Sequence, residues 1–178
     1  MRKSITTRLL AALSIVILFI STSFAVEAQD IEYKVKALYI IRLAAFITWP
    51  ENPENETFKI CIESSDPVSI QLKQSSISVV KGRKLEIIDL TSDLSISQCN
   101  FLYLSQGKIN SAITKTPIVT VSSQAGFAKQ GGMIEFYIEN TKVRMKANLQ
   151  SANDAGIKLS SKLIRLLKIV KPLENDDV

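Results

Sequence analysis

Histidine is absent from this chain of 178 residues, and that absence excludes whole classes of function. Without an imidazole there is no Ser-His-Asp or Cys-His activation of a nucleophile, no histidine phosphorelay and none of the usual zinc sites. Lysine- or carboxylate-based chemistry remains open, but no G-x-S-x-G, P-loop or G-x-G-x-x-G spacing supports it. The sequence therefore predicts a protein without enzymatic activity, cofactor or metal.

Long hydrophobic runs are also scarce, and the clearest one lies near the N-terminus. Arg2, Lys3 and Arg8 precede an uncharged apolar run at 9–20, and small residues follow it. This layout is typical of a secretory signal peptide, and the run is well short of the roughly 20 residues that a membrane-spanning helix needs. We expect residues 1–28 to be a signal peptide, cleaved near residue 25 or 28, with a retained N-terminal anchor as the alternative. The mature chain is then expected to work outside the cytoplasm.

Cysteine occurs only twice, as Cys61 and Cys99. In a chain that is exported to an oxidising compartment, an even pair indicates a disulfide. Closing a loop of about 39 residues would stabilise the fold by about 4 kcal/mol on the chain-entropy account. Two free buried thiols and a redox-responsive pair are the alternatives, because a permanent bridge and one that is reduced as a signal have the same sequence.

Neither sign of charge dominates once the expected signal peptide is set aside. Its removal leaves 19 basic and 16 acidic residues, a net charge of +3. No basic block interleaved with aromatic residues is present, so the composition does not indicate nucleic-acid binding. No apolar stretch beyond the leader is long enough to cross a membrane. We expect one domain over residues 29–173, followed by a disordered acidic tail at 174–178.

The order of the expected elements predicts an α/β fold. Asp30 can cap a helix over 31–49, which Pro50 ends because a proline disfavours the α conformation in the residue before it. Apolar residues cover most of this helix, so we expect it to be buried on most sides. Short apolar runs bounded by turn residues predict strands at 58–63, 84–90, 100–104 and 117–121, with helices beginning at Asp66-Pro67 and spanning 106–114.

The last third of the chain adds a hairpin and a helix. Residues 133–138 and 142–147 alternate apolar and polar, which predicts an antiparallel hairpin that turns at residues 139–140. Asn148 is placed to cap a closing helix whose apolar face runs over 152–170. Together these elements predict a single-domain α/β sandwich, a mixed β-sheet flanked by helices, with a C-terminal hairpin and helix.

Four segments, taken together, resemble the YfiR family of periplasmic proteins. They are YKVKALYIIRLAAFITWP (33–50), the cysteine pair on adjacent expected strands, Phe127 followed by GGMIEF (131–136), and VRMKAN (143–148) followed by AGIKLSSKLIRL (155–166). Each segment alone is a weak signal, but their order and spacing make the match specific. The resemblance covers nearly the whole mature chain.

The resemblance implies a small, dimer-forming α/β protein without enzymatic activity. It further implies binding to the periplasmic sensor domain of a membrane-bound diguanylate cyclase, which is held inactive until envelope stress or oxidative misfolding releases it. Cyclic-di-GMP and biofilm formation would then rise. One member of that family has a second cysteine pair in its C-terminal half, whereas this chain has only Cys61 and Cys99. Redox control of that second kind is therefore not expected here.

A candidate ligand pocket is suggested by the first expected helix. Arg42 lies between Tyr39 and Phe46 on the helical wheel, near Trp49, on an otherwise apolar stripe. A guanidinium beside aromatic faces suits an anionic or aromatic small ligand. The alternative is an arginine at a helix edge, whose head group reaches solvent while its stem covers apolar surface.

A candidate partner surface comes from the later motifs. Phe127 is either an exposed anchor for a partner or a residue that fills the core beneath its loop. The pair Gly131 and Gly132 either lets a partner backbone approach closely or supplies positive φ angles at the hairpin entry. Three basic residues are expected on one helical stripe, where they either dock an acidic surface or form a solvated face. They are Lys158, Lys162 and Arg165.

The sequence is consistent with two functions. The first is an inhibitory binding module that docks onto the periplasmic domain of an inner-membrane signalling protein, a diguanylate cyclase by the resemblance, and favours its inactive state. The second is a small-ligand carrier or sensor of the envelope, with a pocket near Arg42. If the hairpin forms a sheet edge, its unpaired backbone could add a strand from a partner or from a second copy of the chain.

Overall fold

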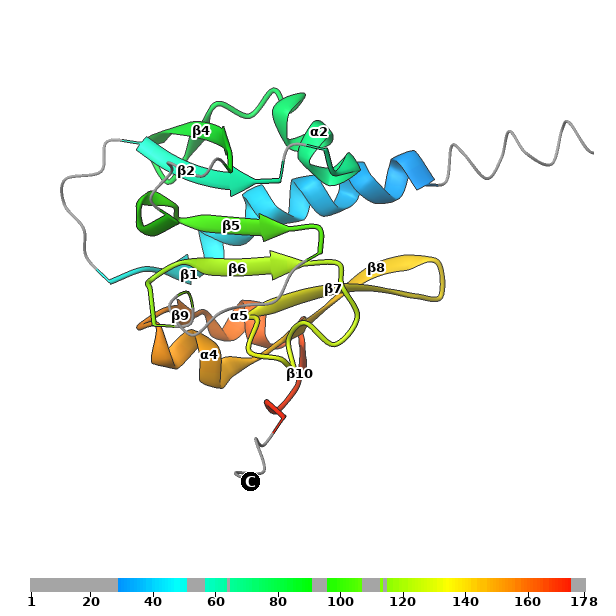
Figure 1. Ribbon diagram of the computed structural model, residues 1–178, viewed down its shortest axis with the longest axis vertical. Coiled ribbons are helices and arrows are strands. Elements are labelled where there is room, and N and C mark those ends of the chain that lie inside the picture. Colours follow the sequence, from blue (N-terminus) through cyan, green and yellow to red (C-terminus); the bar gives the residue numbers. More distant parts are fainter. Residues whose placement is uncertain are drawn as a thin grey trace, which may run out of the picture.

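The computed structural model describes residues 29–50, 57–63, 65–90, 96–106, 113 and 115–173. The expected signal peptide and the expected acidic tail lie outside these residues. Within them the chain forms a mixed eight-stranded sheet in the order β10-β8-β7-β6-β5-β2-β4-β3, and a separate pair of short strands, β1 and β9 (Figure 1). The strands are β1 (Ile47–Thr48), β2 (Thr57–Ile62), β3 (Val79–Val80), β4 (Arg83–Asp89), β5 (Phe101–Leu104), β6 (Val119–Ser122), β7 (Ile134–Glu139), β8 (Lys142–Ala147), β9 (Lys158–Leu159) and β10 (Lys168–Ile169).

The centre of the sheet is parallel. β2 pairs in parallel with both β4 and β5, and β6 joins β5 to β7 in the same direction. Antiparallel pairs flank this parallel centre, β7 with β8 on one side and β3 with β4 on the other, and β10 adds a short parallel pair outside β8. Every residue of β5 and β6 is buried, as expected for strands covered on both faces. The predicted α/β fold with a mixed sheet is confirmed.

The two faces of the sheet bury different clusters. Ile60 and Ile62 of β2 face the larger cluster, which includes buried residues of the first helix, α2 (Pro67–Lys73), α4 (Leu149–Asp154) and α5 (Ser161–Ile164). Cys61, which points the other way, belongs to a smaller cluster with Leu102 and Phe127. Because successive side chains of a strand alternate between faces, one strand contributes to both clusters. The first helix, α2, α4 and α5 therefore pack on one face, whereas the other face is covered in part by the short 3-10 helix η2 (Ile96–Gln98) and by the loop that carries Phe127.

The first helix is shorter than predicted. It spans 29–43 among the described residues, continues as a short 3-10 turn, η1 (Ala44–Phe46), and gives way to strand β1. Ile47 takes an extended conformation because it pairs with Leu159 of β9. One stripe of the helix is buried in the larger cluster, whereas Arg42 is exposed and Tyr39 is half-buried. The prediction of a helix buried on most sides was wrong.

The predicted closing helix over 152–170 is also wrong, because four short elements occupy this stretch. Gly156 adopts a left-handed conformation, with φ of +70°, directly after α4. The chain then forms β9, α5 and β10, and the Ser160 side chain caps α5 by accepting a hydrogen bond from Leu163 N. The expected cap of α4 is confirmed, since Asn148 Oδ1 accepts from Ser151 N at 3.0 Å.

The predicted hairpin is confirmed, with its turn one residue later than expected. Asn140 and Thr141 both have positive φ, 50° and 60°, as a two-residue turn of type I′ requires. Most of the helix expected at 106–114 lies outside the described residues. In the part of the chain that the structure describes, no helix has the length and apolar character needed to cross a membrane.

Candidate functional site

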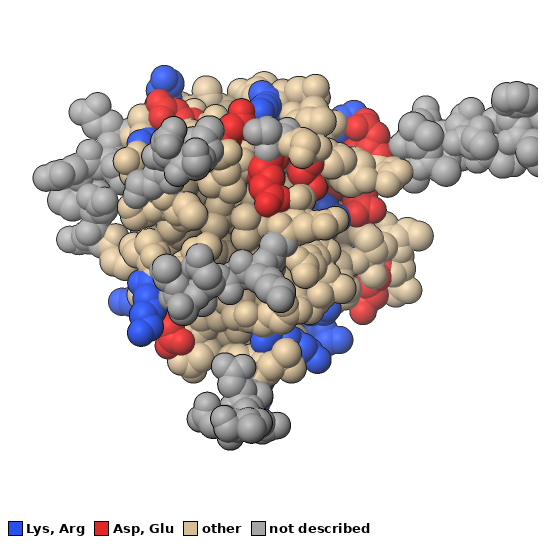
Figure 2. Space-filling view, viewed as in Figure 1, with Lys and Arg blue, Asp and Glu red and all other residues tan. Residues whose placement is uncertain are grey.

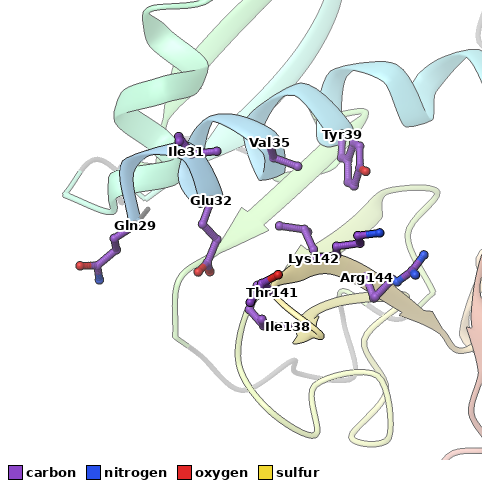
Figure 3. A pocket seen from close by; sticks show the side chains of 10 residues that line it. Gln29, Ile31, Glu32, Val35, Tyr39, Ile138, Thr141, Lys142 and Arg144 are labelled. Carbon is purple, nitrogen blue, oxygen red and sulfur yellow. The ribbon is translucent and has the colours of Figure 1, made fainter. Parts of the chain in front are cut away.

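A cleft opens between the first helix and the β7–β8 hairpin, whose side chains line its two sides (Figure 3). We call it the helix–hairpin cleft, and its volume is about 640 Å³. Its lining residues come from the N-terminal half of the helix and from the hairpin tip. They are Gln29, Ile31, Glu32, Val35, Tyr39, Ile138, Thr141, Lys142, Val143 and Arg144.

A second, smaller cavity continues the cleft towards the body of the molecule. We call it the Arg42 cavity; its volume is about 250 Å³. Tyr39, Val143 and Arg144 line both spaces. The full lining of the Arg42 cavity is Tyr39, Arg42, Leu43, Phe46, Val143, Arg144, Met145, Leu163 and Leu166. The two spaces therefore adjoin each other, and apolar side chains make up much of both linings.

Three of the four residues of the predicted ligand pocket meet at the Arg42 cavity. Tyr39, Arg42 and Phe46 lie on its wall, and the Tyr39 ring centroid is 6.4 Å from that of Phe136 on β7. Arg42 lines the cavity and is exposed to solvent. Its guanidinium can therefore reach a ligand, and the protein does not have to bury a charged group in its core. Arg144 lies on the same wall, with its Nε 4.0 Å from Glu139 Oε2.

Trp49 is not part of this cavity. Its indole packs edge-on against Phe58 and Phe101, with ring centroids 5.3 and 5.6 Å away. Its Nε1 donates a hydrogen bond to the backbone oxygen of Asn100 at 3.1 Å. Because the helix ends at residue 43, Trp49 lies beyond it and does not share a helix face with Tyr39 and Arg42. Its contacts hold the end of β1 against the core. Its assignment to the pocket was wrong.

Phe127 fills the core beneath its loop, so it is not an exposed anchor. Its side chain is 2% exposed and joins the cluster that contains the disulfide. A Cβ on Gly132 would lie 2.2 Å from the Phe127 ring, which explains why position 132 has no side chain. Gly131 has φ of +101° and supplies the left-handed conformation at the hairpin entry. The structure thus explains why both positions are glycine.

The three basic residues of the predicted partner surface are exposed but do not share a helix. Lys158 lies on β9, Lys162 on α5, and Arg165 directly after it. Their expected helical spacing disappears because Gly156 ends α4 before they begin. Leu163 and Leu166, which are interleaved with them, line the Arg42 cavity. On the face seen in Figure 2, most acidic side chains lie in the upper half, whereas basic side chains also occur along the lower edge.

The cysteines form the predicted disulfide. Cys61 of β2 and Cys99 join across a Cα–Cα distance of 5.9 Å, and neither is free. Both are buried, and Cys61 pairs in register with Leu102 of β5, three residues after Cys99. The bridge therefore links β2 to the start of the neighbouring parallel strand, under the cluster that holds Phe127.

A polar cluster at the carboxyl ends of β2 and β5 was missed in the sequence. Glu63 Oε2 accepts hydrogen bonds from Ser105 N at 2.6 Å and from Ser105 Oγ. Burial raises the pKa of the Tyr103 phenol well above its usual range, so this group stays protonated. The carboxylate is committed to donors of its own chain, which indicates a structural cluster. Among the residues described, no three potential ligands gather to hold a metal.

The hairpin wall of the cleft was also missed. Sequence reasoning treated residues 142–147 as a half-exposed strand and placed the pocket on the first helix alone. The alternation of Val143 and Met145 with Lys142, Arg144 and Lys146 was the available signal. Across the cleft from the first helix, β8 thus offers apolar side chains and exposed cations, an arrangement that is suited to binding a ligand or a partner segment.

Comparison with protein families matches residues 33–167 to the model of the YfiR/HmsC-like family. No curated protein matches the chain. The family match covers most of the first helix, the β7–β8 hairpin and both cysteines, from Tyr33 to the last buried leucine, Leu167. The chain belongs to the YfiR/HmsC-like family.

Proposed function

We propose that this chain is a periplasmic, non-enzymatic regulatory protein. It binds the sensor domain of an inner-membrane signalling protein, a diguanylate cyclase, and represses it, so that it limits cyclic-di-GMP and biofilm formation. The observation that carries this proposal is the family match over residues 33–167. The buried disulfide and the apolar cleft with exposed cations are features that a binding module of an oxidising compartment would use.

Repression of this kind needs no chemistry in the repressor. A protein that binds the inactive conformation of its partner more tightly than the active one shifts the partner towards inactivity by that difference in affinity. Unfolding or loss of the bound surface removes the difference and relieves repression. Two copies of the chain associate in the proposed assembly, as the family resemblance implies, and light scattering of the purified mature chain measures that directly.

Deletion of the gene tests the regulatory role. Cellular cyclic-di-GMP should rise, and re-expression of the wild-type chain should restore the original level. Re-expression of a variant without residues 1–28 separates location from binding, because a chain that stays in the cytoplasm cannot reach a periplasmic domain. An unchanged cyclic-di-GMP level on deletion, with the membrane cyclases intact, would contradict the proposal.

A small-ligand carrier or sensor is the second candidate, and the Arg42 cavity is the observation that favours it. Its apolar walls and its two arginines, Arg42 and Arg144, suit an aromatic or aliphatic carboxylate. Calorimetric titration with nucleotides and aromatic amino acids should detect binding that Arg42→Gln weakens and Lys84→Gln, on β4, leaves unchanged. Equal binding by both variants would reject this cavity as the site. Trp49 is an indirect reporter for such a titration, because it lies outside the cavity.

A further inference from the structure

β8 is covered along only a short part of its outer edge. Among the described residues, β7 pairs with the whole of β8, whereas β10 reaches only Lys146 and Ala147. Val170 N donates to Ala147 O at 2.9 Å, so the backbone groups of Ala147 point outward, away from β7. Because these directions alternate along a strand, Val143 and Met145 direct their backbone groups to the same outer edge. The stretch from Lys142 to Met145 therefore offers an edge to which a strand can be added.

The two cavities follow this edge. Residues from both faces of β8 line them, Val143 and Met145 from the helix face and Arg144 from the opposite face. A space lined by side chains of both faces of a strand reaches the side of that strand, here in addition to the hairpin tip and the face towards the helix. The helix–hairpin cleft adjoins β8 from Lys142 to Arg144, and the Arg42 cavity adjoins it from Val143 to Met145. Successive spaces along an edge suit alternate side chains of an added strand, roughly 7 Å apart.

The charges of β8 specify what such a strand must carry. Lys142, Arg144 and Lys146 lie on one face, opposite Glu139, Tyr137 and Glu135 of β7 in the register. Lys146 is paired with the buried Glu135 at 2.6 Å, whereas Arg144 has only a loose contact, 4.0 Å, with the exposed Glu139. The side chains of Lys142 and Arg144 lie along the open part of the edge, where directly opposed charges of unlike sign stabilise a strand pair. Val143 and Met145, on the other face, require apolar neighbours.

We infer that the outer edge of β8, from Lys142 to Met145, binds an extended partner segment in which apolar and acidic residues alternate. The apolar side chains enter the helix–hairpin cleft and the Arg42 cavity, and the carboxylates lie beside Lys142 and Arg144. For the natural partner this rests on the proposed function, of which it names the contact. A second copy of β8 does not fit, because it would bring its own Lys142, Arg144 and Lys146 against the same cations.

A designed peptide tests the chemistry of the edge. The probe is a blocked octapeptide of alternating valine and glutamate, and its matched control has lysine in place of each glutamate. Titration of the mature chain at low salt should show at least tenfold tighter binding of the glutamate peptide. Arg144→Glu should remove or reverse that preference, while Lys84→Glu, an equal change of charge on β4, should preserve it. Equal affinities for the two peptides, or binding of neither up to roughly 1 mM, would overturn the inference.

A proline tests the backbone contact. Val143→Pro removes an outward N–H and is compatible with an edge position, whereas Val143→Ala removes a similar part of the side chain and keeps the N–H. Both variants should fold with similar circular dichroism, and only Val143→Pro should lose the glutamate peptide. Should Val143→Pro fail to fold, a glutamate peptide with N-methylated backbone amides serves the same purpose and should not bind. If the proline variant or the methylated peptide binds as well as its control, strand addition is excluded.

Capture of the sensor domain from solubilised membranes separates this inference from the proposed function. If the wild-type chain captures that domain and Val143→Pro captures it equally, the edge is not the contact, although the regulatory role stands. If the wild-type chain captures no signalling protein while the peptide preference holds, the regulatory role fails and the strand-binding edge remains.

Discussion

The ring of Phe127 occupies the space that a side chain at position 132 would need. A Cβ on Gly132 would lie 2.2 Å from Cδ1 of that ring, and the ring itself is buried in the cluster around the disulfide. Gly132 N also donates to the backbone oxygen of Phe127 at 2.9 Å. This hydrogen bond closes the loop from 127 to 132, and the buried ring anchors the loop directly before the hairpin.

Gly132→Ala should destabilise the fold by a clash with a buried ring. Overpacking of this kind costs about 1–3 kcal/mol, and Phe127→Ala alone costs about 3–5 kcal/mol through the cavity that it leaves. The double variant should be less destabilised than the sum of the two, because the added methyl no longer meets a ring. Urea unfolding of the four proteins measures this coupling, and strict additivity would contradict the close contact.

Loss of the disulfide should lower the free energy of unfolding by about 4 kcal/mol, because the bridge restrains a loop of about 39 residues in the unfolded chain. Cys61→Ala with Cys99→Ala provides the comparison, since buried serine hydroxyls would add a cost of their own. Because Cys61 and Cys99 are buried, thiol reagents should reduce the native bridge only slowly. Rapid reduction in the absence of denaturant, followed by mass spectrometry, would show instead that the segment over the bridge opens readily.

Substitutions of Glu135 and Lys146 should lower the free energy of unfolding by different amounts. The Glu135 carboxylate is 1% exposed and accepts from Lys146 Nζ at 2.6 Å and from Ala128 N at 3.1 Å. Lys146→Met leaves that carboxylate in the core without its cation, which should lower the free energy of unfolding by about 3 kcal/mol. Glu135→Gln leaves an ammonium that can still reach water, so it should cost less, about 1–2 kcal/mol. Chemical unfolding that reverses this order would contradict the buried position of the carboxylate.

Alkaline pH should weaken the fold through Tyr103. Burial raises the pKa of its phenol in the folded state, whereas the same group in the unfolded chain ionises near pH 10. Above about pH 10 the folded state therefore binds more protons than the unfolded state, and the free energy of unfolding falls as pH rises. This group alone contributes a slope of up to about 1.4 kcal/mol per pH unit. Between pH 9 and 11, Tyr103→Phe should show a shallower decline than the wild type; parallel declines would contradict the prediction.

Much of the sheet could be predicted because its signals are local. The runs around Phe58, Leu85 and Phe101 are apolar, short and bounded by turn residues, and each is a strand within one or two residues of its expected bounds. Asp66 accepts from Val68 N at 2.7 Å, as a helix cap followed by a proline should. The disulfide could be predicted because the chain has two cysteines and is expected in an oxidising compartment. These features depend on neighbours in the sequence, so the sequence contains them.

The misplaced elements fail for a common reason. Residues 152–170 have helical periodicity, but Gly156 is left-handed and β9 pairs with β1, a contact that joins residues more than 100 positions apart. That same pairing ends the first helix before Trp49. A helical wheel assumes one continuous helix, so every residue placed beyond such a break is assigned to the wrong face. Trp49 and the basic residues after position 156 were misplaced for this reason.

The sequence by itself determined the absence of histidine chemistry, the α/β class, the cysteine pair and the family, because composition and local patterns carry that information. Only the tertiary structure decided that Phe127 is internal and that Tyr39 and Arg42 share a wall with Val143 and Arg144. These residues are about 100 positions apart, and they meet because the first helix packs on a face of the sheet to which the hairpin strands belong. The cleft between helix and hairpin, and the open part of the β8 edge, exist only once that packing has formed.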